Sequence, residues 1–411
     1  MLSYIKLIYS GYKYYKNTDI IKDKNYRDRL KCIINDCGLY VIKAFQLAIP
    51  YIDIFKYIDE DTLNDIKSEF NMYYDMCNIH DLEYTKQLYK RDFDEDIYDK
   101  YSIHEIIGSG SVAQVYKIKC KKTNNYYAMK VVHPINKYHE YIIYLIYNIL
   151  NYFNLSIINI DIYKLIKDIY SQFDLVNEVN NILMFKSLYE TDIIKAPNII
   201  KFSKNIIIMD YIEKKEISLE LKNTLITIIH NIQYYYDWFH GDLHKGNMIF
   251  NDDKLYVVDF SSSFNTYADP KILRSIHYNV NHDFYVYALK VCDPDIDKKM
   301  IDKFIKIYDE NKKLSKKKCF EHRDICSQFV LFCKNNNIIL DGQIVNIIFN
   351  VIYYDNLVEE SFNDVILRSY DLCNKYKIYC EYFKHIEKDI KENIKYRCEK
   401  YKDLEYLIQF N

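Results

Sequence analysis

The feature that most constrains this chain is a set of three polar residues at fixed spacing. Asp242 and Asn247 lie five positions apart in HGDLHKGN, and Asp259 ends the apolar run LYVVD after the turn signal NDDK. Taken singly, each would read as an ordinary surface or turn residue. Together they have the spacing of a phosphate-transfer site, in which a carboxylate faces the attacking oxygen and two oxygen ligands hold Mg²⁺. We therefore predict that Asp242 is catalytic and that Asn247 and Asp259 bind the metal.

Glycine is scarce, with 7 in 411 residues, yet it recurs in two short segments. Gly241 and Gly246 lie beside the predicted catalytic and metal residues, and GSGSVAQV holds two more. This second segment is similar to GxGxxGxV, whose backbone passes close to phosphates, although an ordinary hairpin turn is the simpler alternative. The predicted nucleotide-binding residues are Gly108, Ser109, Gly110, Ser111, Val112, Ala113, Gln114 and Val115.

A lysine and a glutamate complete the expected site. Lys130 follows Gly108 by 22 residues and lies in the apolar run YAMKVV, which predicts a strand lysine that binds the α and β phosphates of ATP. Such a lysine needs an acidic partner on a helix. Glu178, in QFDLVNEVNNILMF, is the candidate, and a solvated surface glutamate is the alternative. We predict catalytic roles for both residues.

The separation of these two residues is long, and residues 141–160 fill much of it. This stretch carries no charge for twenty residues, which is long enough to span a bilayer. Four asparagines, four tyrosines and its position between motifs of one aqueous site favour a buried helix instead. The opening stretch MLSYIKLIYSGYKYY lacks the pattern of a secretory signal, and a weak amphipathic contact with a membrane remains the alternative there. We expect no transmembrane helix.

The composition bounds the partners and the compartment. The formal charge is −2, so no bulk electrostatic attraction to nucleic acid is expected. Eleven cysteines without a CxxC pair suit free thiols in a reducing compartment such as the cytoplasm. The abundance of Ile, Asn, Lys and Tyr suggests an A/T-rich genome, such as that of a large DNA virus or certain protists. For a viral protein, the compartment would be the host cytoplasm.

The order of predicted elements indicates an α+β fold of the bilobal protein-kinase kind. Residues 1–100 have helical periodicity and form an N-terminal extension. Residues 101–213 contain a three-strand meander, a helical segment and two strands, and residues 214–411 are mainly helical. We expect a helix through TLITIIHNIQYYYDWF that runs directly into HGDLHKGN. His240 is expected to brace that loop, and Asp283 in HDFYVYAL is a weaker candidate for the same task.

Further motifs resemble the UbiB/ADCK atypical kinases, a family associated with coenzyme Q biosynthesis. The loop SVAQV is similar to that family's alanine-rich loop, MKVVHP to its strand end, and HGDLHKGN to its H-D-HPGN loop. Lys43 and Gln46 in KAFQ match the KxGQ motif of its N-terminal helix. Gln172 and Asp174 in QFD match its ExD motif. The resemblance spans about residues 30 to 265 and implies a kinase-like fold, ATP and Mg²⁺ as cofactors, and a helix that folds over the site.

The chain departs from the family pattern in four places. Phe45 replaces the glycine of KxGQ, and Gln172 removes a charged partner for Lys43. GSG replaces alanines in the loop, which should ease the approach of nucleotide and favour transfer over hydrolysis. Ser261 replaces the glycine of DFG, which should reduce flexibility after Asp259.

Three functions are compatible with these residues. The leading one is a UbiB-like kinase or ATPase that acts on ATP with Mg²⁺. A small-molecule phosphotransferase of the aminoglycoside or choline kinase type shares HGDLHxGN but not the KAFQ helix, the SVAQVY loop or the long insert. A nucleotide-binding pseudokinase scaffold is the non-enzymatic alternative. The sequence does not identify the acceptor, although a lipid, a small molecule and a peripheral membrane contact all fit the resemblance.

Overall fold

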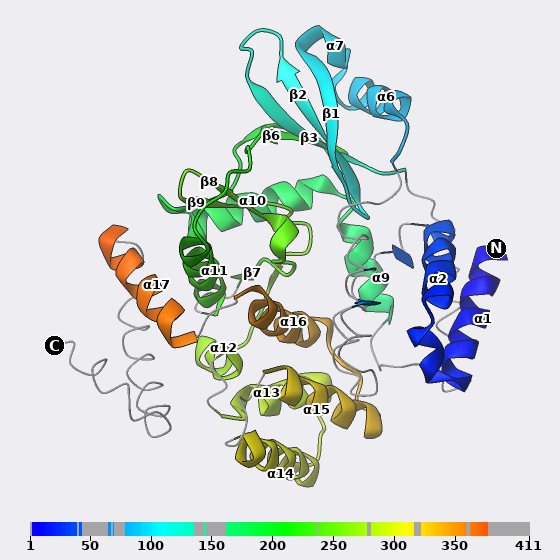
Figure 1. The fold of residues 1–411 in the computed structure, drawn as a ribbon, viewed down its shortest axis with the longest axis vertical. Helices are drawn as coiled ribbons and strands as arrows, with labels where there is room; N and C mark the ends of the chain where they lie inside the picture. The colour runs from blue at the N-terminus through cyan, green and yellow to red at the C-terminus, as the bar shows by residue number, and fades with distance from the viewer. Residues whose placement is uncertain are drawn as a thin grey trace.

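The chain folds into a small sheet-containing lobe and a larger helical lobe, with a helical extension at the N-terminus (Figure 1). The computed structural model describes residues 2–38, 41–42, 65–66, 69, 79–134, 144, 162–234, 236, 238–277, 281–315, 322–358 and 362–376. The predicted α+β, protein-kinase-like bilobal fold class is confirmed.

The smaller lobe is built on an antiparallel sheet with the strand order β1-β2-β3-β6-β5. Its strands are β1 (Tyr101–Ser109), β2 (Ala113–Cys120), β3 (Tyr126–Val132), β5 (Ile199–Phe202) and β6 (Ile206–Asp210). Asn124 closes the turn between β2 and β3 with a φ of 59°, a conformation that asparagine tolerates better than most residues. The predicted meander and the two later strands are therefore confirmed.

Helix α10 (Leu175–Tyr189) connects the two lobes, and α9 (Ile162–Ser171) precedes it. Asp174 caps the start of α10 by accepting a hydrogen bond from the backbone N–H of Val176. The first turns bury Leu175 and Val179 in the core of the sheet lobe. Later turns bury Ile182, Phe185 and Tyr189 in a core shared with the larger lobe. Glu178, which lies between these two sets, is thereby held at the junction of the lobes.

The larger lobe begins with α11 (Leu219–Gln233) and a group of short strands. These are β7 (Trp238–Phe239), which pairs with β10 (Phe264–Asn265), and β4 (Ile194–Lys195), which pairs with the hairpin β8 (Met248–Asn251) and β9 (Lys254–Val257). Asp252 and Asp253 turn the hairpin with φ of 48° and 59°, as a two-residue hairpin of the I′ type requires. This hairpin confirms the predicted turn at NDDK.

The predicted helix through residues 224–239 is wrong at its end. Helix α11 stops at Gln233, and Trp238 and Phe239 form a strand instead. Phe239 stacks on Phe264 across the β7–β10 pair, with ring centroids 5.5 Å apart. A pairing with a strand 25 residues away overrides the local apolar pattern here, because tertiary contacts outweigh propensity.

The remainder of the larger lobe is helical, as predicted for its described part. The helices are α12 (Pro270–His277), α13 (Asp283–Cys292), α14 (Lys298–Ser315), α15 (His322–Asn335), α16 (Gly342–Leu357) and α17 (Phe362–Tyr376). Helices α12 to α16 share one apolar core, and α17 packs on α11.

The extension contains α1 (Leu2–Lys16), the short 3₁₀ helix η1 (Thr18–Lys22), α2 (Lys24–Cys37), α6 (Leu82–Phe93) and α7 (Ile97–Lys100). Helices α1 and α2 pack on each other, whereas α6 and α7 join the core of the sheet lobe. Lys43, Gln46 and nearly all of 141–160 lie outside the described residues. Within the described ranges, no helix is both long and apolar enough to cross a bilayer.

Candidate active site

A cleft of about 240 Å³ between the lobes is lined by most of the residues predicted from the sequence. Its lining is of two kinds. The apolar side chains come mainly from the sheet and the β8–β9 hairpin: Ile107, Val115, Ala128, Met209, Ile249 and Val258. The polar side chains come from the junction of the lobes: Lys130, Glu178, Asp242, His244, Asn247, Asp259 and Ser261. Such a lining suits a ligand with a flat apolar ring joined to a charged group.

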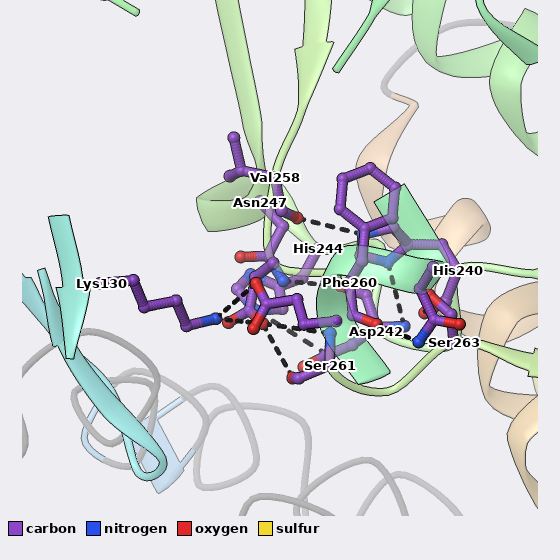
Figure 2. Close-up of polar contacts among 12 residues, drawn as sticks. Lys130, His240, Asp242, His244, Asn247, Val258, Phe260, Ser261 and Ser263 are labelled. Atoms are coloured by element: carbon purple, nitrogen blue, oxygen red, sulfur yellow. Dashed lines mark hydrogen bonds and ion pairs between the residues drawn. The ribbon is translucent and has the colours of Figure 1, made fainter. Parts of the chain in front are cut away.

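Lys130 lies at the centre of the polar part, where it joins three elements. It projects from β3, whose backbone is fixed by β2 and β6 on its two sides. Its Nζ lies 2.8 Å from Oε1 of Glu178 and 2.9 Å from Oδ1 of Asp259. Figure 2 shows the lysine reaching from the sheet toward residues that follow β7 and β9. The structure thus brings together a lysine and two acids that lie 48 and 129 positions from it in the sequence.

The electrostatics of this cluster keep the lysine charged. The side chains of Lys130 and Glu178 are 7% and 1% exposed, whereas that of Asp259 is 41% exposed. Burial opposes the charge of Lys130, but the attraction of Asp259 and Glu178 outweighs it, so the pKa of Lys130 is raised above its ordinary value. A permanent cation at this point suits the binding of phosphate.

Asp259, two residues after the end of β9, is held in an unusual backbone conformation. Its φ of 59° lies in the left-handed region, which costs a residue with a side chain about 1 kcal/mol or more. Its Oδ1 accepts a hydrogen bond of 2.8 Å from Oγ of Ser261. The serine that replaces glycine in DFG therefore orients the carboxylate, an effect that the sequence did not indicate.

Asn247 ends the short 3₁₀ helix η2 (Lys245–Asn247), and a hydrogen bond determines which way its side-chain amide points. Its Nδ2 lies 2.8 Å from the carbonyl oxygen of Asp242, and only the amide NH₂ can donate to a carbonyl. The amide oxygen is the remaining polar atom of a side chain that lines the cleft. The backbone N–H of Val258 donates to the carbonyl of Asn247, which fixes this loop against the segment between β9 and Asp259.

His240 fixes the HGDLHKGN loop (residues 240–247) against the segment that follows β9. Its Nε2 donates to the carbonyl of Val258 at 3.0 Å, and its ring packs on Phe260 with centroids 4.8 Å apart. The side chain of Gln233 accepts from the backbone N–H of His240. Burial lowers the pKa of His240 to about 4, so the ring is neutral at neutral pH. A neutral, fully enclosed imidazole suits a brace better than a proton carrier.

Gly241 meets the clearest conformational demand in this loop. Its φ is +78°, and a Cβ there would lie 2.1 Å from the carbonyl oxygen of Ser262. The loop crosses the backbone that follows Phe260 so closely that only glycine fits.

His244 contributes both to the loop and to the cleft. Its Nδ1 accepts a hydrogen bond from the N–H of Gly246 at 3.0 Å, which leaves the proton of a neutral ring on Nε2. That Nε2 lies 3.8 Å from Oδ1 of Asp242. The imidazole therefore shapes the turn and also faces the predicted catalytic carboxylate.

The glycine-rich loop (residues 108–115) forms one wall of the cleft, with one exception. The backbone N–H of Gly110 donates to the carbonyl of Ala113 and closes a tight turn. A Cβ at Gly108 would meet nothing within 4 Å, so this position faces open space. Gln114, however, is wrongly assigned to the nucleotide site, because it is buried and bonds to His80 and Tyr116 instead. Successive side chains of a strand point to opposite faces, so Ala113 and Val115 face the cleft and Gln114 does not.

Gln172, Asp174 and Asp283 lie away from the cleft lining. Gln172 is buried between α9 and α10, and Asp174 caps α10 and lies 3.6 Å from Lys204. Asp283 does not brace the HGDLHKGN loop, because its side chain is exposed and accepts a hydrogen bond from Asn281. That expectation is wrong, since Asp283 lies in the first turn of α13, where acids favour the helix dipole.

One positioning residue was missed in the sequence. Asn181 on α10 donates from Nδ2 to the carbonyl of Phe260 at 2.9 Å. It lies three positions after Glu178, on the same face of the helix. The available signal was this i, i+3 spacing. The helical face that contacts Lys130 also contacts the segment after Asp259.

Comparisons with known proteins identify one family. The family described as ABC1 atypical kinase-like domain matches residues 73–284, which is just over half of the chain. A search of curated proteins finds no match. Among solved structures, a protein of Mycobacterium tuberculosis in complex with erythromycin is 12% identical, with 76% of this chain and 90% of that chain covered and a TM-score of 0.42. A score this low carries no conclusion about function.

Proposed function

The chain belongs to the ABC1 atypical kinase-like family, the UbiB family, and we propose that it is a Mg²⁺-dependent phosphotransferase or ATPase that uses ATP. One observation carries this proposal. Lys130 contacts both Glu178 and Asp259 in a cleft that Asp242 and Asn247 also line. A fixed cation, a carboxylate for the attacking oxygen and two oxygen ligands are the parts that phosphate transfer requires.

In this proposal, the cleft binds ATP with its base among the apolar side chains and its phosphates beside Lys130. The glycine-rich loop covers the phosphates, and Glu178 fixes the ammonium that contacts them. Asn247 and Asp259 would hold Mg²⁺, since amide and carboxylate oxygens are the ligands it prefers. When bound, the ion neutralises charge on the phosphates.

Asp242 is the proposed proton acceptor. As the oxygen of an acceptor hydroxyl or of water bonds to the γ-phosphorus, its proton passes to the carboxylate of Asp242. The bond from that phosphorus to the bridging oxygen breaks, and ADP leaves with the electron pair. Nε2 of His244 lies 3.8 Å from Oδ1 of Asp242, so the imidazole lies beside the proposed proton acceptor.

The test is release of ADP by wild type and Asp242→Asn, with Asp253→Asn in the exposed hairpin turn as the matched control. We expect Asp242→Asn to lose about 100-fold or more in rate, the usual contribution of a general base, while ATP binding measured by calorimetry is retained. The control should keep the wild-type rate. If wild type binds ATP with Mg²⁺ but turns over none, the pseudokinase scaffold replaces this proposal.

The acceptor is a separate question, and we propose a small molecule or a lipid. Transfer of γ-phosphate to a panel of amines, sugars and lipids, against water alone, separates a small-molecule phosphotransferase from an ATPase. Helix α1 supports a peripheral contact with a lipid surface. It exposes Leu2, Ile5 and Tyr9 and has lysines but no acidic residue. A reducing compartment remains the proposed location, because the free cysteines of the described residues include the buried Cys326 and Cys333.

A further inference from the structure

A buried polar network connects the helical extension to the glycine-rich loop. It lies on the opposite face of β2 from Ala113 and Val115, which line the cleft. Its side chains come from four segments: His80 before α6, Thr85 in α6, Gln114 and Tyr116 in β2, and His133 after β3. All but His80 are at most 2% exposed. None of these five residues lines the cleft.

His133 holds the turn of the glycine-rich loop at two points. Its backbone N–H donates to the carbonyl of Val112 at 3.0 Å. Its ring Nε2 lies 3.0 Å from the carbonyl of Gly110 and 3.4 Å from Oγ of Ser109. A carbonyl only accepts, so Nε2 must carry a proton. Both ends of the turn at residues 110–112 are therefore fixed by one residue, three positions after Lys130.

The second ring nitrogen of His133 makes the connection to the extension. Nδ1 of His133 lies 2.8 Å from Nδ1 of His80, so one nitrogen must donate and the other accept. Since a neutral His133 has its proton on Nε2, its Nδ1 accepts and His80 donates. Burial and then the neighbouring His133 lower the pKa of His80 to about 4, against the opposing charge of Asp81, and burial also lowers the pKa of His133. Both rings are therefore neutral at neutral pH.

With both rings neutral, the remaining hydrogen bonds have one consistent direction. The backbone N–H of His80 donates to Gln114 at 3.0 Å, and the Gln114 amide donates to the hydroxyl of Tyr116 at 2.6 Å. That hydroxyl donates to Thr85, whose own hydroxyl donates to Nε2 of His80 at 2.9 Å. These hydrogen bonds form a closed cycle that begins and ends at His80. The bond from His80 to His133 connects this cycle to Gly110. The ring of Tyr84 also faces His80, at a centroid distance of 5.0 Å.

We propose that His133 is a positioning residue for the phosphate-binding turn, and that His80 transmits the position of the helical extension to that turn. A displacement of the segment before α6 would withdraw the donor from Nδ1 of His133 and loosen the contact with Gly110. The turn would then be less ordered where the phosphates of a nucleotide bind. The proposal rests on the proposed function in that the cleft binds ATP.

The test compares ATP with adenosine in wild type, His133→Phe, His133→Gln and His80→Phe. Phenylalanine keeps the ring and removes both hydrogen bonds, whereas glutamine keeps a donor and an acceptor. We expect His133→Phe to weaken ATP binding roughly tenfold, as the loss of one buried hydrogen bond to the loop would. Adenosine, which lacks phosphates, should bind as it does to wild type. His133→Gln should recover most of the loss, and His80→Phe should show a smaller loss for ATP alone. His104→Phe, an exposed histidine of the same sheet, is the matched control.

Hydrogen–deuterium exchange of residues 108–115 without nucleotide gives a second, independent readout. We expect faster exchange in both Phe variants of the network and the wild-type rate in His104→Phe. Equal losses for ATP and adenosine, or unchanged exchange, would overturn the positioning role. If His133→Phe does not fold, His80→Phe decides the matter, since its ring is half-buried. If wild type binds no ATP, the proposed function fails, and the exchange experiment still decides whether the network orders the turn.

Discussion

Removal of Lys130 should leave a buried charge whose cost depends on pH. In Lys130→Met, Glu178 would remain 1% exposed without its ammonium partner, whereas Asp259, 41% exposed, would stay solvated. Loss of one partner from a buried pair costs about 3–5 kcal/mol. This cost cannot exceed the free energy of protonating Glu178, which would remove the buried charge. For an unfolded pKa of about 4.3, that free energy is about 1.4 kcal/mol for each pH unit above 4.3, or roughly 3.7 kcal/mol at pH 7 and 1.6 kcal/mol at pH 5.5.

The sign follows from the direction of the shift. Without Lys130, the folded pKa of Glu178 lies above the unfolded value, so the variant loses stability as pH rises above about 4.3. The double variant Lys130→Met with Glu178→Gln has no buried charge and should recover at least half of the loss at pH 7. Urea unfolding can be followed by the fluorescence of Trp238, the one tryptophan, which is 3% exposed and packs near Phe260. An equal loss at pH 7 and pH 5.5, or no recovery in the double variant, would refute this reasoning.

Three further predictions concern the loop, the histidines and the metal ligands. Gly241→Ala should lower the free energy of unfolding by more than about 2 kcal/mol, because Gly241 has a positive φ and a Cβ there would contact Ser262. Gly11→Ala, in exposed helix α1 with nothing within 4 Å, should instead stabilise the protein by about 0.5–1 kcal/mol in the same urea assay. Acid should destabilise the fold as pH falls from about 6.5 toward 4, since burial lowers the pKa of His230 to about 3 and that of His240 to about 4. His230→Phe should reduce this pH dependence of the unfolding free energy by about 1.4 kcal/mol per pH unit. An unchanged slope would contradict the lowered pKa of His230. Asp259→Asn should raise the Mg²⁺ concentration needed for half-maximal ATP hydrolysis about tenfold or more, with Asp253→Asn unchanged; equal requirements would exclude Asp259 as a ligand.

The fold was predictable where turn chemistry and periodicity agree. The meander from Tyr101 to Val132 and the hairpin at Asp252 and Asp253 follow from apolar runs separated by Asn, Asp and Lys. The end of α11 was not predictable, because Phe239 leaves the helical pattern to pair with Phe264, and local sequence does not encode such a partner. The loop at HGDLHKGN shows a similar mixture. The scarcity of glycine correctly predicted that the backbone of Gly241 is constrained. Gly246 does not have a positive φ, so its backbone conformation does not account for a glycine at that position.

The candidate site was predictable in its charged residues and less so in their support. Lys130, Glu178 and Asp259 are separated widely in the sequence, and the spacing of a phosphate-transfer site anticipated their meeting. Gln114 was misplaced because its motif was read as a continuous string, although strand alternation turns every second side chain away. The supporting contacts of Ser261, Asn181 and His133 depend on distances between elements, which a single sequence does not contain.

The most direct test of the central claim is Mg²⁺-dependent ATP hydrolysis by wild type and Lys130→Met, with Lys122→Met in the exposed turn of the same sheet as control. The contacts of Lys130 with Glu178 and Asp259 predict that its loss lowers the rate about 100-fold or more, while Lys122→Met keeps the wild-type rate. Equal rates in wild type and Lys130→Met would contradict the claim that this cleft transfers phosphate.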